Sequence, residues 1–164
     1  MKRRWIIAWT ITILSGVLLH FLYGWLPNRL TALIAPVNES VWEHLKLLFW
    51  PYLAAAWLLV RRDVEPWRAW TGHLLALLIM PMGLLGSYYA LKSGFAVEAQ
   101  WLDIALYALW LGLGFALARH VGFSRRAEQY APPLLLAVCL WAVLLTLFTF
   151  SAPPLPVFLP GISA

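Results

Sequence analysis

Five long apolar runs follow one another along the chain, and they constrain the fold more than any other feature. They cover residues 5–25, 40–60, 67–90, 101–118 and 132–150, and the stretches between them hold most of the charged residues. A helix of about 20 residues crosses the ~30 Å hydrocarbon core of a bilayer with its backbone hydrogen bonds satisfied internally. The runs therefore predict an all-α integral membrane bundle of about five transmembrane helices, a single transmembrane domain over residues 1–164. Residues 151–164 hold four prolines and no charge, so we expect an irregular Pro-rich tail.

The composition indicates lipid as the main environment of the chain. Apolar residues make up 63% of the sequence, charged residues only 12%, and the mean hydropathy is +0.77, outside the usual range of water-soluble domains. The net charge of +5 does not indicate nucleic-acid binding, because the basic residues form short clusters between apolar runs. We expect membrane lipids as partners, no nucleic acid, and no protein partner that the sequence identifies. The one cysteine, Cys139, allows neither an intrachain disulfide nor a cysteine-based metal site.

The distribution of Lys and Arg predicts the orientation in the membrane. Nine of the twelve basic residues fall on one side of the expected bundle, in the N-terminal segment and around the loops that follow the second and fourth runs. The other side holds Arg29 and Lys92, with Lys46 inside the second run. Because cytoplasmic loops carry the excess of Lys and Arg, the N-terminus is expected inside and the C-terminus outside.

Ionisable residues within the apolar runs point to a functional site, because each is costly in lipid unless it is paired or hydrated. They concentrate in residues 36–46, Pro-Val-Asn-Glu-Ser-Val-Trp-Glu-His-Leu-Lys, which open the second run at the expected outer face. At about 100° per residue, Glu39, Glu43 and Lys46 share an arc of about 60° on a helix, and His44 lies about 100° from Glu43.

His20 lies at the depth expected for His44, about 22 Å into the first helix. Gly16 and Gly24, one turn before and one turn after His20, form a small-residue stripe. Such stripes allow close helix approach, so His20 is expected to face the bundle and to share one outer pocket with His44 and Glu43.

Two histidines and one carboxylate are a typical donor set of catalytic zinc sites. Asp103 lies near the same outer face, at the start of the fourth run. We therefore expect Zn²⁺ held by His20, His44 and either Asp103 or Glu39, with Glu43 as the catalytic base and Glu39 as its replacement. The first functional hypothesis is a metal-dependent hydrolase or transferase that acts on a lipid-like substrate at the outer face.

A second hypothesis is an ion or proton transporter that uses the same histidines and carboxylates transiently. A transporter needs a polar path across the membrane. Between His44 and the cytoplasmic side the sequence offers only hydroxyls such as Thr10, Thr12 and Ser15, which favours the enzyme over the transporter.

A third hypothesis is a non-catalytic, partner-binding membrane protein in which the polar segment only caps and orders the second helix. Ser40 and Glu43 fit a capping box, Glu43 and Lys46 an i,i+3 ion pair, and Asp103 a cap of its own helix. His73 belongs to none of these groups, because it is expected about 10 Å from the cytoplasmic end, where reaching the interface or bonding a backbone carbonyl would satisfy it.

Residues 18–23, Leu-Leu-His-Phe-Leu-Tyr, and residues 35–46, Ala-Pro-Val-Asn-Glu-Ser-Val-Trp-Glu-His-Leu-Lys, carry a resemblance to a known family. The chain resembles an uncharacterised family of small bacterial multi-pass membrane proteins, a domain of unknown function, most closely over residues 14–51. The resemblance implies location in the bacterial inner membrane and names no substrate.

Overall fold

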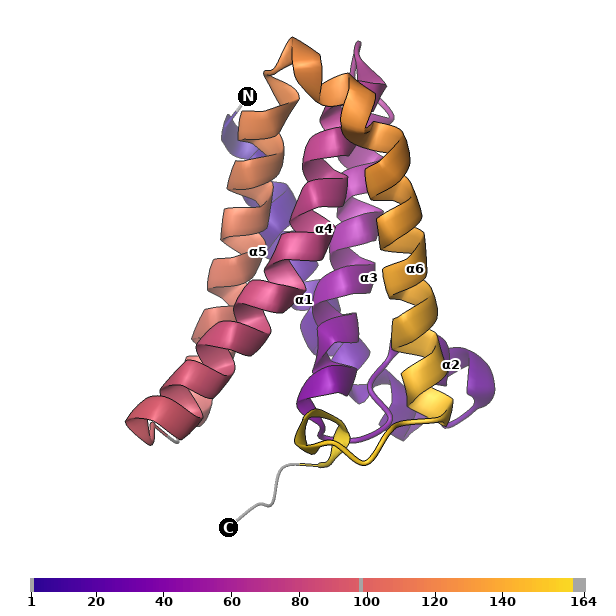
Figure 1. The fold of residues 1–164 in the computed structure, drawn as a ribbon, viewed down its shortest axis with the longest axis vertical. Helices are drawn as coiled ribbons and strands as arrows, with labels where there is room; N and C mark the ends of the chain where they lie inside the picture. Colours follow the sequence, from indigo (N-terminus) through magenta and orange to yellow (C-terminus); the bar gives the residue numbers. More distant parts are fainter. Residues whose placement is uncertain (1, 98, 161–164) are drawn as a thin grey trace.

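The structure, a computed structural model, describes residues 2–97 and 99–160, and it is built of helices joined by short connections. Five long helices run roughly lengthwise through the molecule (Figure 1). They are α1 (Lys2–Trp25), α3 (Val41–Val60), α4 (Pro66–Tyr89), α5 (Gln100–Gly122) and α6 (Ala131–Phe150). At one end of the molecule, α4 and α5 are tilted away from the others. Shorter elements are α2 (Arg29–Ile34), a π-helical turn η1 (Ala90–Gly94) that extends α4, and two 3₁₀ turns, η2 (Arg125–Tyr130) and η3 (Pro156–Phe158). The predicted all-α fold is confirmed, with each long helix close to its expected apolar run.

Four helical stretches are long and apolar enough to cross a membrane: Arg3–Trp25, Pro66–Gly94, Trp101–Gly122 and Arg125–Phe150. Their outer surfaces expose large apolar side chains, among them Leu14, Leu18, Leu136 and Leu140. Exposed apolar surface on this scale suits a hydrocarbon solvent. The protein is therefore an all-α membrane bundle.

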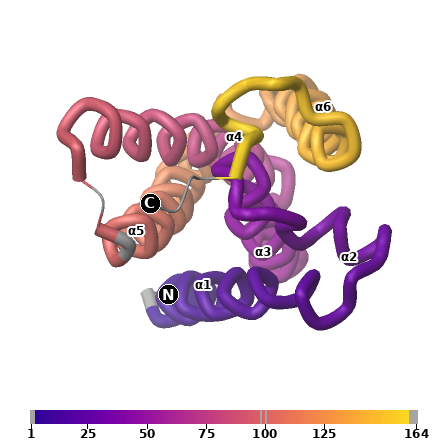
Figure 2. The backbone as a smooth tube through the Cα atoms, turned by 90° about the horizontal axis from the view of Figure 1, so that it is seen from below, coloured from indigo at the N-terminus to yellow at the C-terminus, as the bar shows by residue number. Residues whose placement is uncertain are grey.

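The remaining long helix, α3, differs from the others in composition and in position. Glu43, His44 and Lys46 lie in its first two turns, and it is not among the four helices apolar enough to cross a membrane. Figure 2 shows α3 in the centre of the molecule, with α1 on one side and α4 and α6 on the other, and it packs against all three. Glu43 and Lys46 of α3 are buried in protein and so shielded from hydrocarbon, whereas Trp57 and Leu58 further along the helix are exposed. That α3 is a fifth crossing stays a prediction.

The polar start of α3 lies at the end of the bundle opposite to the start of α1, together with α2 and the segment that follows α6 (Figure 1). The first and last described residues are thus at opposite ends of the bundle, as an odd number of crossings requires. Which end faces the cytoplasm stays a prediction from the charge distribution.

The described part of the Pro-rich tail, residues 151–160, has one short 3₁₀ turn and packs against the start of α3. Phe158 in η3 is buried, with its ring centroid 4.9 Å from that of Trp42 and 5.1 Å from that of Phe148. An antiparallel bridge joins Pro160 to Ser40. An aromatic anchor therefore holds this segment across the start of α3, and residues 161–164 of the expected irregular tail lie outside the described residues.

Candidate metal centre at the start of α3

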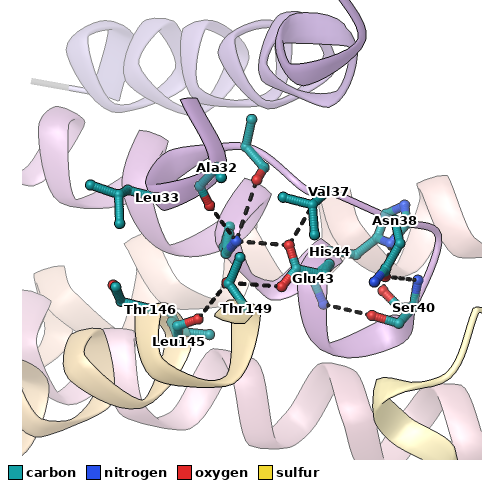
Figure 3. Close-up of polar contacts among 12 residues, drawn as sticks. Ala32, Leu33, Val37, Asn38, Ser40, Glu43, His44, Leu145, Thr146 and Thr149 are labelled. Atoms are coloured by element: carbon teal, nitrogen blue, oxygen red, sulfur yellow. Dashed lines mark hydrogen bonds and ion pairs between the residues drawn. The ribbon is translucent and has the colours of Figure 1, made fainter. Parts of the chain in front are cut away.

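Glu43 and Lys46, one turn apart on α3, form a buried ion pair. The Lys46 Nζ lies 2.7 Å from the Glu43 Oε2. The Lys46 side chain is 0% exposed and the Glu43 side chain 3%. The same ammonium donates to the carbonyl oxygens of Ala32 at 2.7 Å and Ala35 at 3.3 Å (Figure 3). Each of its three protons therefore has an acceptor, which offsets much of the cost of burying a charge.

The Glu43 carboxylate has two further partners from distant parts of the chain. The backbone N–H of Val37 donates to Oε2 at 2.9 Å, and the Thr149 hydroxyl on α6 donates to Oε1 at 3.0 Å. Glu43 thereby joins α3 to the α2–α3 connection and to α6. Both oxygens of the carboxylate thus have hydrogen-bond partners within the protein, and the catalytic role expected of Glu43 stays a prediction.

Ser40 caps the N-terminus of α3, with its hydroxyl accepting from the backbone N–H of Glu43 at 3.3 Å. The backbone N–H of Ser40 donates to the Asn38 side-chain oxygen at 2.9 Å. The expected capping box is therefore half formed, because the Glu43 side chain accepts from Val37 and not from Ser40. The Pro-Val-Asn-Glu-Ser turn is held by its own side chains, which fixes the residues that follow it.

His44 is oriented by the first turn of its own helix. Its Nδ1 lies 2.8 Å from the carbonyl oxygen of Ser40. A carbonyl only accepts, so Nδ1 carries the proton and neutral His44 presents the lone pair of Nε2. That Nε2 faces the Glu39 carboxylate, with 3.4 Å between Nε2 and Oε2. Two acceptors at this distance repel unless a cation, either a proton or a metal ion, lies between them.

His20 on α1 reaches the same place from the neighbouring helix. Its ring centroid lies 5.2 Å from that of His44. Its Nδ1 is buried and has no hydrogen-bond partner among the described residues. A buried ring nitrogen without a partner is costly, and a bound cation would satisfy it.

Close packing at Gly16 brings α1 to this position. A Cβ at Gly16 would overlap the Tyr107 hydroxyl and lie 3.1 Å from the carbonyl oxygen of Leu47. The Tyr107 hydroxyl itself donates to that carbonyl at 3.2 Å, so it sits between α1, α3 and α5. At Gly24, the other member of the expected stripe, an added Cβ would meet no atom within 4 Å. Only the Gly16 half of the stripe therefore serves helix approach.

His20, Glu39 and His44 form a group whose three donor atoms all lie within 4.8 Å of one another. The separation between the His44 Nε2 and the Glu39 Oε2, 3.4 Å, is the distance expected for two ligands of one tetrahedral zinc ion, about 3.4 Å for bonds of 2.0–2.2 Å. The ligand atom of His20 lies within 4.8 Å of both. Two nitrogens and one oxygen leave a fourth position open, as in catalytic zinc sites.

Asp103 does not belong to this group. Its Oδ2 lies 3.0 Å from the Nζ of Lys92, so it joins the start of α5 to the end of the α4 extension. Its expected depth along the bundle does not bring it to the histidines, because α5 contacts α4 far more extensively than it contacts the start of α3. The carboxylate at the histidine pair is Glu39, the alternative expected from the sequence.

Thr149 holds one oxygen of the Glu43 carboxylate, and sequence reasoning did not single it out. The available signal was a hydroxyl in the last turn of the fifth apolar run, at the expected depth of Glu43.

His73 lies apart from the site: its Nδ1 is 3.0 Å from the Tyr52 hydroxyl, its ring stacks on Trp5 at 5.7 Å, and it is 1% exposed. Among the described residues its hydrogen bond is to a side-chain hydroxyl and not to a backbone carbonyl.

Comparison with known proteins adds a family and no activity. A family model described as "Family of unknown function (DUF6512)" matches residues 1–164, the whole chain. No curated protein and no solved structure matches the chain significantly.

Proposed function

The chain belongs to a family of unknown function, DUF6512, and from its own residues we propose that it is a metal-dependent membrane hydrolase or transferase that acts on a lipid-like substrate. The observation that carries the proposal is the pairing of a histidine lone pair with a carboxylate at 3.4 Å, beside a second histidine whose buried nitrogen has no partner among the described residues. Zinc fits this donor set best, because imidazole and carboxylate are both common zinc ligands.

The main competitor is a simple ion pair in which His44 is protonated and bonds Glu39. That arrangement accounts for His44 and Glu39 but leaves the His20 Nδ1 unsatisfied. A metal ion bound through the His20 Nδ1 would account for all three side chains at once. The ion-pair explanation does not involve His20, so substitution of His20 distinguishes it experimentally from the metal site.

The chemistry expected of the site follows from its donors and its location. Zinc with three protein ligands and an open position polarises a carbonyl or phosphoryl group and activates water. Glu39 is 71% exposed at its side chain, so the site is accessible from the end of the bundle. The turn at residues 36–40 and the ion pair of Glu43 and Lys46 hold His44 and Glu39 in place, a positioning role for Glu43 in this proposal. The proposal locates the site at the outer face of the bacterial inner membrane, where an amphiphilic substrate in the outer leaflet can enter it.

Metal binding tests the proposal directly. The detergent-purified protein should bind one zinc ion per chain after reconstitution, measured by equilibrium dialysis and elemental analysis. His20→Ala and His44→Ala should each lose stoichiometric zinc, and Glu39→Gln should bind at least about tenfold more weakly. Asp103→Asn, which removes a carboxylate at the same end of the bundle but outside the group, is the matched control and should bind as the wild type does.

Two results would overturn the proposal. If His20→Ala binds zinc as tightly as the wild type, or if reconstituted wild type binds none while remaining folded and monodisperse, the protonated His44 and Glu39 pair is the better explanation. With zinc bound, hydrolysis of a fluorogenic lipid ester or phosphodiester in vesicles is the activity to measure, and it should be lost in the variants that lose the metal.

A further inference from the structure

An apolar groove of about 440 Å³ runs along the bundle between α1 and α3. Its walls include Ala8, Ile11, Ser15 and Leu19 of α1 and Ala54 and Leu58 of α3. Figure 2 shows that these two helices lie side by side, with α2 beside them at one end. The lining is almost wholly apolar, and small side chains on both helices create the hollow.

One end of the groove lies near the candidate metal centre. Leu19, at one end of the lining, directly precedes His20. On α3, Pro51 lines the groove seven residues after His44, which is two helical turns and places both on one face about 10 Å apart. At this end Ile34 of α2 also lines the groove. Trp50 of α3, another lining residue, is tied to α2 because its indole N–H donates to the Leu33 carbonyl at 3.1 Å.

The opposite end of the groove is polar. Arg4 belongs to the lining and lies 3.8 Å from Asp63 in the α3–α4 loop. The groove therefore runs from Leu19, next to His20, to a charged end near the N-terminus. The side chains that line its middle section are apolar apart from the hydroxyls of Thr12 and Ser15.

The size of the groove decides what occupies it. From Arg4 to Leu19 the helix rises about 22 Å, longer than the roughly 15 Å that one leaflet contributes to the ~30 Å hydrocarbon core. A helix of that length would fill about 1,700 Å³ at a diameter of 10 Å, several times the volume of the groove. A single alkyl chain is slender enough, and the membrane around α1 and α3 supplies such chains.

We propose that this groove binds an acyl chain of the lipid-like substrate and so places its head group at His20, Glu39 and His44. This inference rests on the proposed function and adds the substrate class, an amphiphile with at least one long alkyl chain that enters from the side of the membrane. The head group lies at the metal centre, and the chain extends between α1 and α3 towards Arg4.

The test uses the full-length protein in phospholipid vesicles that contain a phosphatidylglycerol with a photoreactive diazirine in one acyl chain. After illumination, labelled peptides are mapped by mass spectrometry. Labelling should concentrate on residues 7–19 of α1 and 50–59 of α3. Ala54 is exposed in the groove, so Ala54→Phe fills the groove without disturbing the core; it should reduce that labelling by about tenfold.

Ala105→Phe is the matched control, because Ala105 is likewise exposed but lies on α5 outside the groove. It should leave the labelling unchanged, and all three proteins should bind zinc equally. Labelling that is spread evenly over α1, α3 and α6 and is unaffected by Ala54→Phe overturns the groove as a chain site, even if zinc binds. Preferential groove labelling in a protein that binds no zinc supports the chain site and overturns the metal-dependent function.

Discussion

Lys46 and Glu43 show how one pair of charged residues is tolerated in the interior of a membrane bundle. The ammonium has three acceptors and the carboxylate three donors, all of them within the protein. A buried ion pair of this kind is weak evidence for net stability, but removing one partner leaves the other as a buried charge without a counter-charge. The pair is therefore best understood as a specificity device, which fixes α2, α3 and α6 relative to one another.

Lys46→Met tests this role. The substitution leaves the Glu43 carboxylate and two carbonyl oxygens without the buried cation, and it should lower the free energy of unfolding by about 3–5 kcal/mol. Unfolding in mixed detergent micelles, followed by tryptophan fluorescence, measures the change. Arg29→Met removes an exposed basic residue at the start of α2 and should change stability by no more than about 0.5 kcal/mol. Equal effects of the two substitutions would show that the buried pair has no special structural role.

At the scale of residues, the sequence predicts which side chains share a depth but not which of them meet. Helical geometry correctly places Glu43 and Lys46 within reach of one another, and the pairing of His20 with His44 follows from their equal depth. Glu43 instead bonds Lys46, Val37 and Thr149, the last of which lies 106 residues later in the chain. Asp103 has a suitable depth but pairs with Lys92. Hydropathy determines position along the membrane normal, whereas lateral neighbours depend on how the helices are arranged around one another.

The helices α1 and α3 depend on one glycine for the approach that brings the two histidines together. Gly16 lies one turn before His20 and packs against Tyr107 and Leu47. Gly24 lies one turn after His20, and a Cβ added there would meet no atom within 4 Å. These two positions form a natural pair for experiment, because they are equally distant from His20 along the same helix.

Gly16→Leu should displace α1 from α3 and α5, because the new side chain overlaps the Tyr107 hydroxyl. We expect zinc affinity to fall by about 10- to 100-fold, the usual effect of disturbing the support of a metal ligand. Gly24→Leu should bind zinc as the wild type does. Isothermal titration in detergent measures both, and a loss of affinity in Gly24→Leu equal to that in Gly16→Leu would contradict the packing argument.

Among the elements, the long apolar helices are the ones that the sequence predicts well, because length and hydropathy specify them without reference to neighbours. The short helix α2 and the anchored segment around Phe158 are not predicted. Both depend on tertiary contacts: Lys46 binds carbonyl oxygens at the end of α2, and the ring of Phe158 packs on Trp42. Prolines indicate where a helix ends, but not what the following segment packs against.

For the whole molecule, the decisive question is whether α3 crosses the membrane. Its composition falls short of the four clear spans, but it lies among them and, like them, runs roughly lengthwise through the molecule. If it crosses, the chain makes five crossings and its ends lie on opposite sides. If it does not, four crossings return the C-terminus to the side of the N-terminus. The expected position of the C-terminus therefore depends on the fifth crossing, whereas the outer location of the metal centre depends only on α1 crossing with the N-terminus inside.

Cysteine accessibility separates these arrangements. In a Cys139→Ala background, Asn38→Cys places a thiol beside the metal centre, and Ser124→Cys places one in the basic loop between α5 and α6. With nine of twelve basic residues on the side of that loop, the positive-inside bias predicts that Ser124→Cys faces the cytoplasm. A membrane-impermeant maleimide added to intact cells from which any outer membrane has been removed should label Asn38→Cys and leave Ser124→Cys unlabelled until the cells are permeabilised. A C-terminal alkaline phosphatase fusion, which is active only outside the cytoplasm, should be active in the same orientation. Labelling of Ser124→Cys but not of Asn38→Cys in intact cells would show that the bundle is inverted. Labelling of both thiols together with an inactive fusion would show that the chain does not make the fifth crossing.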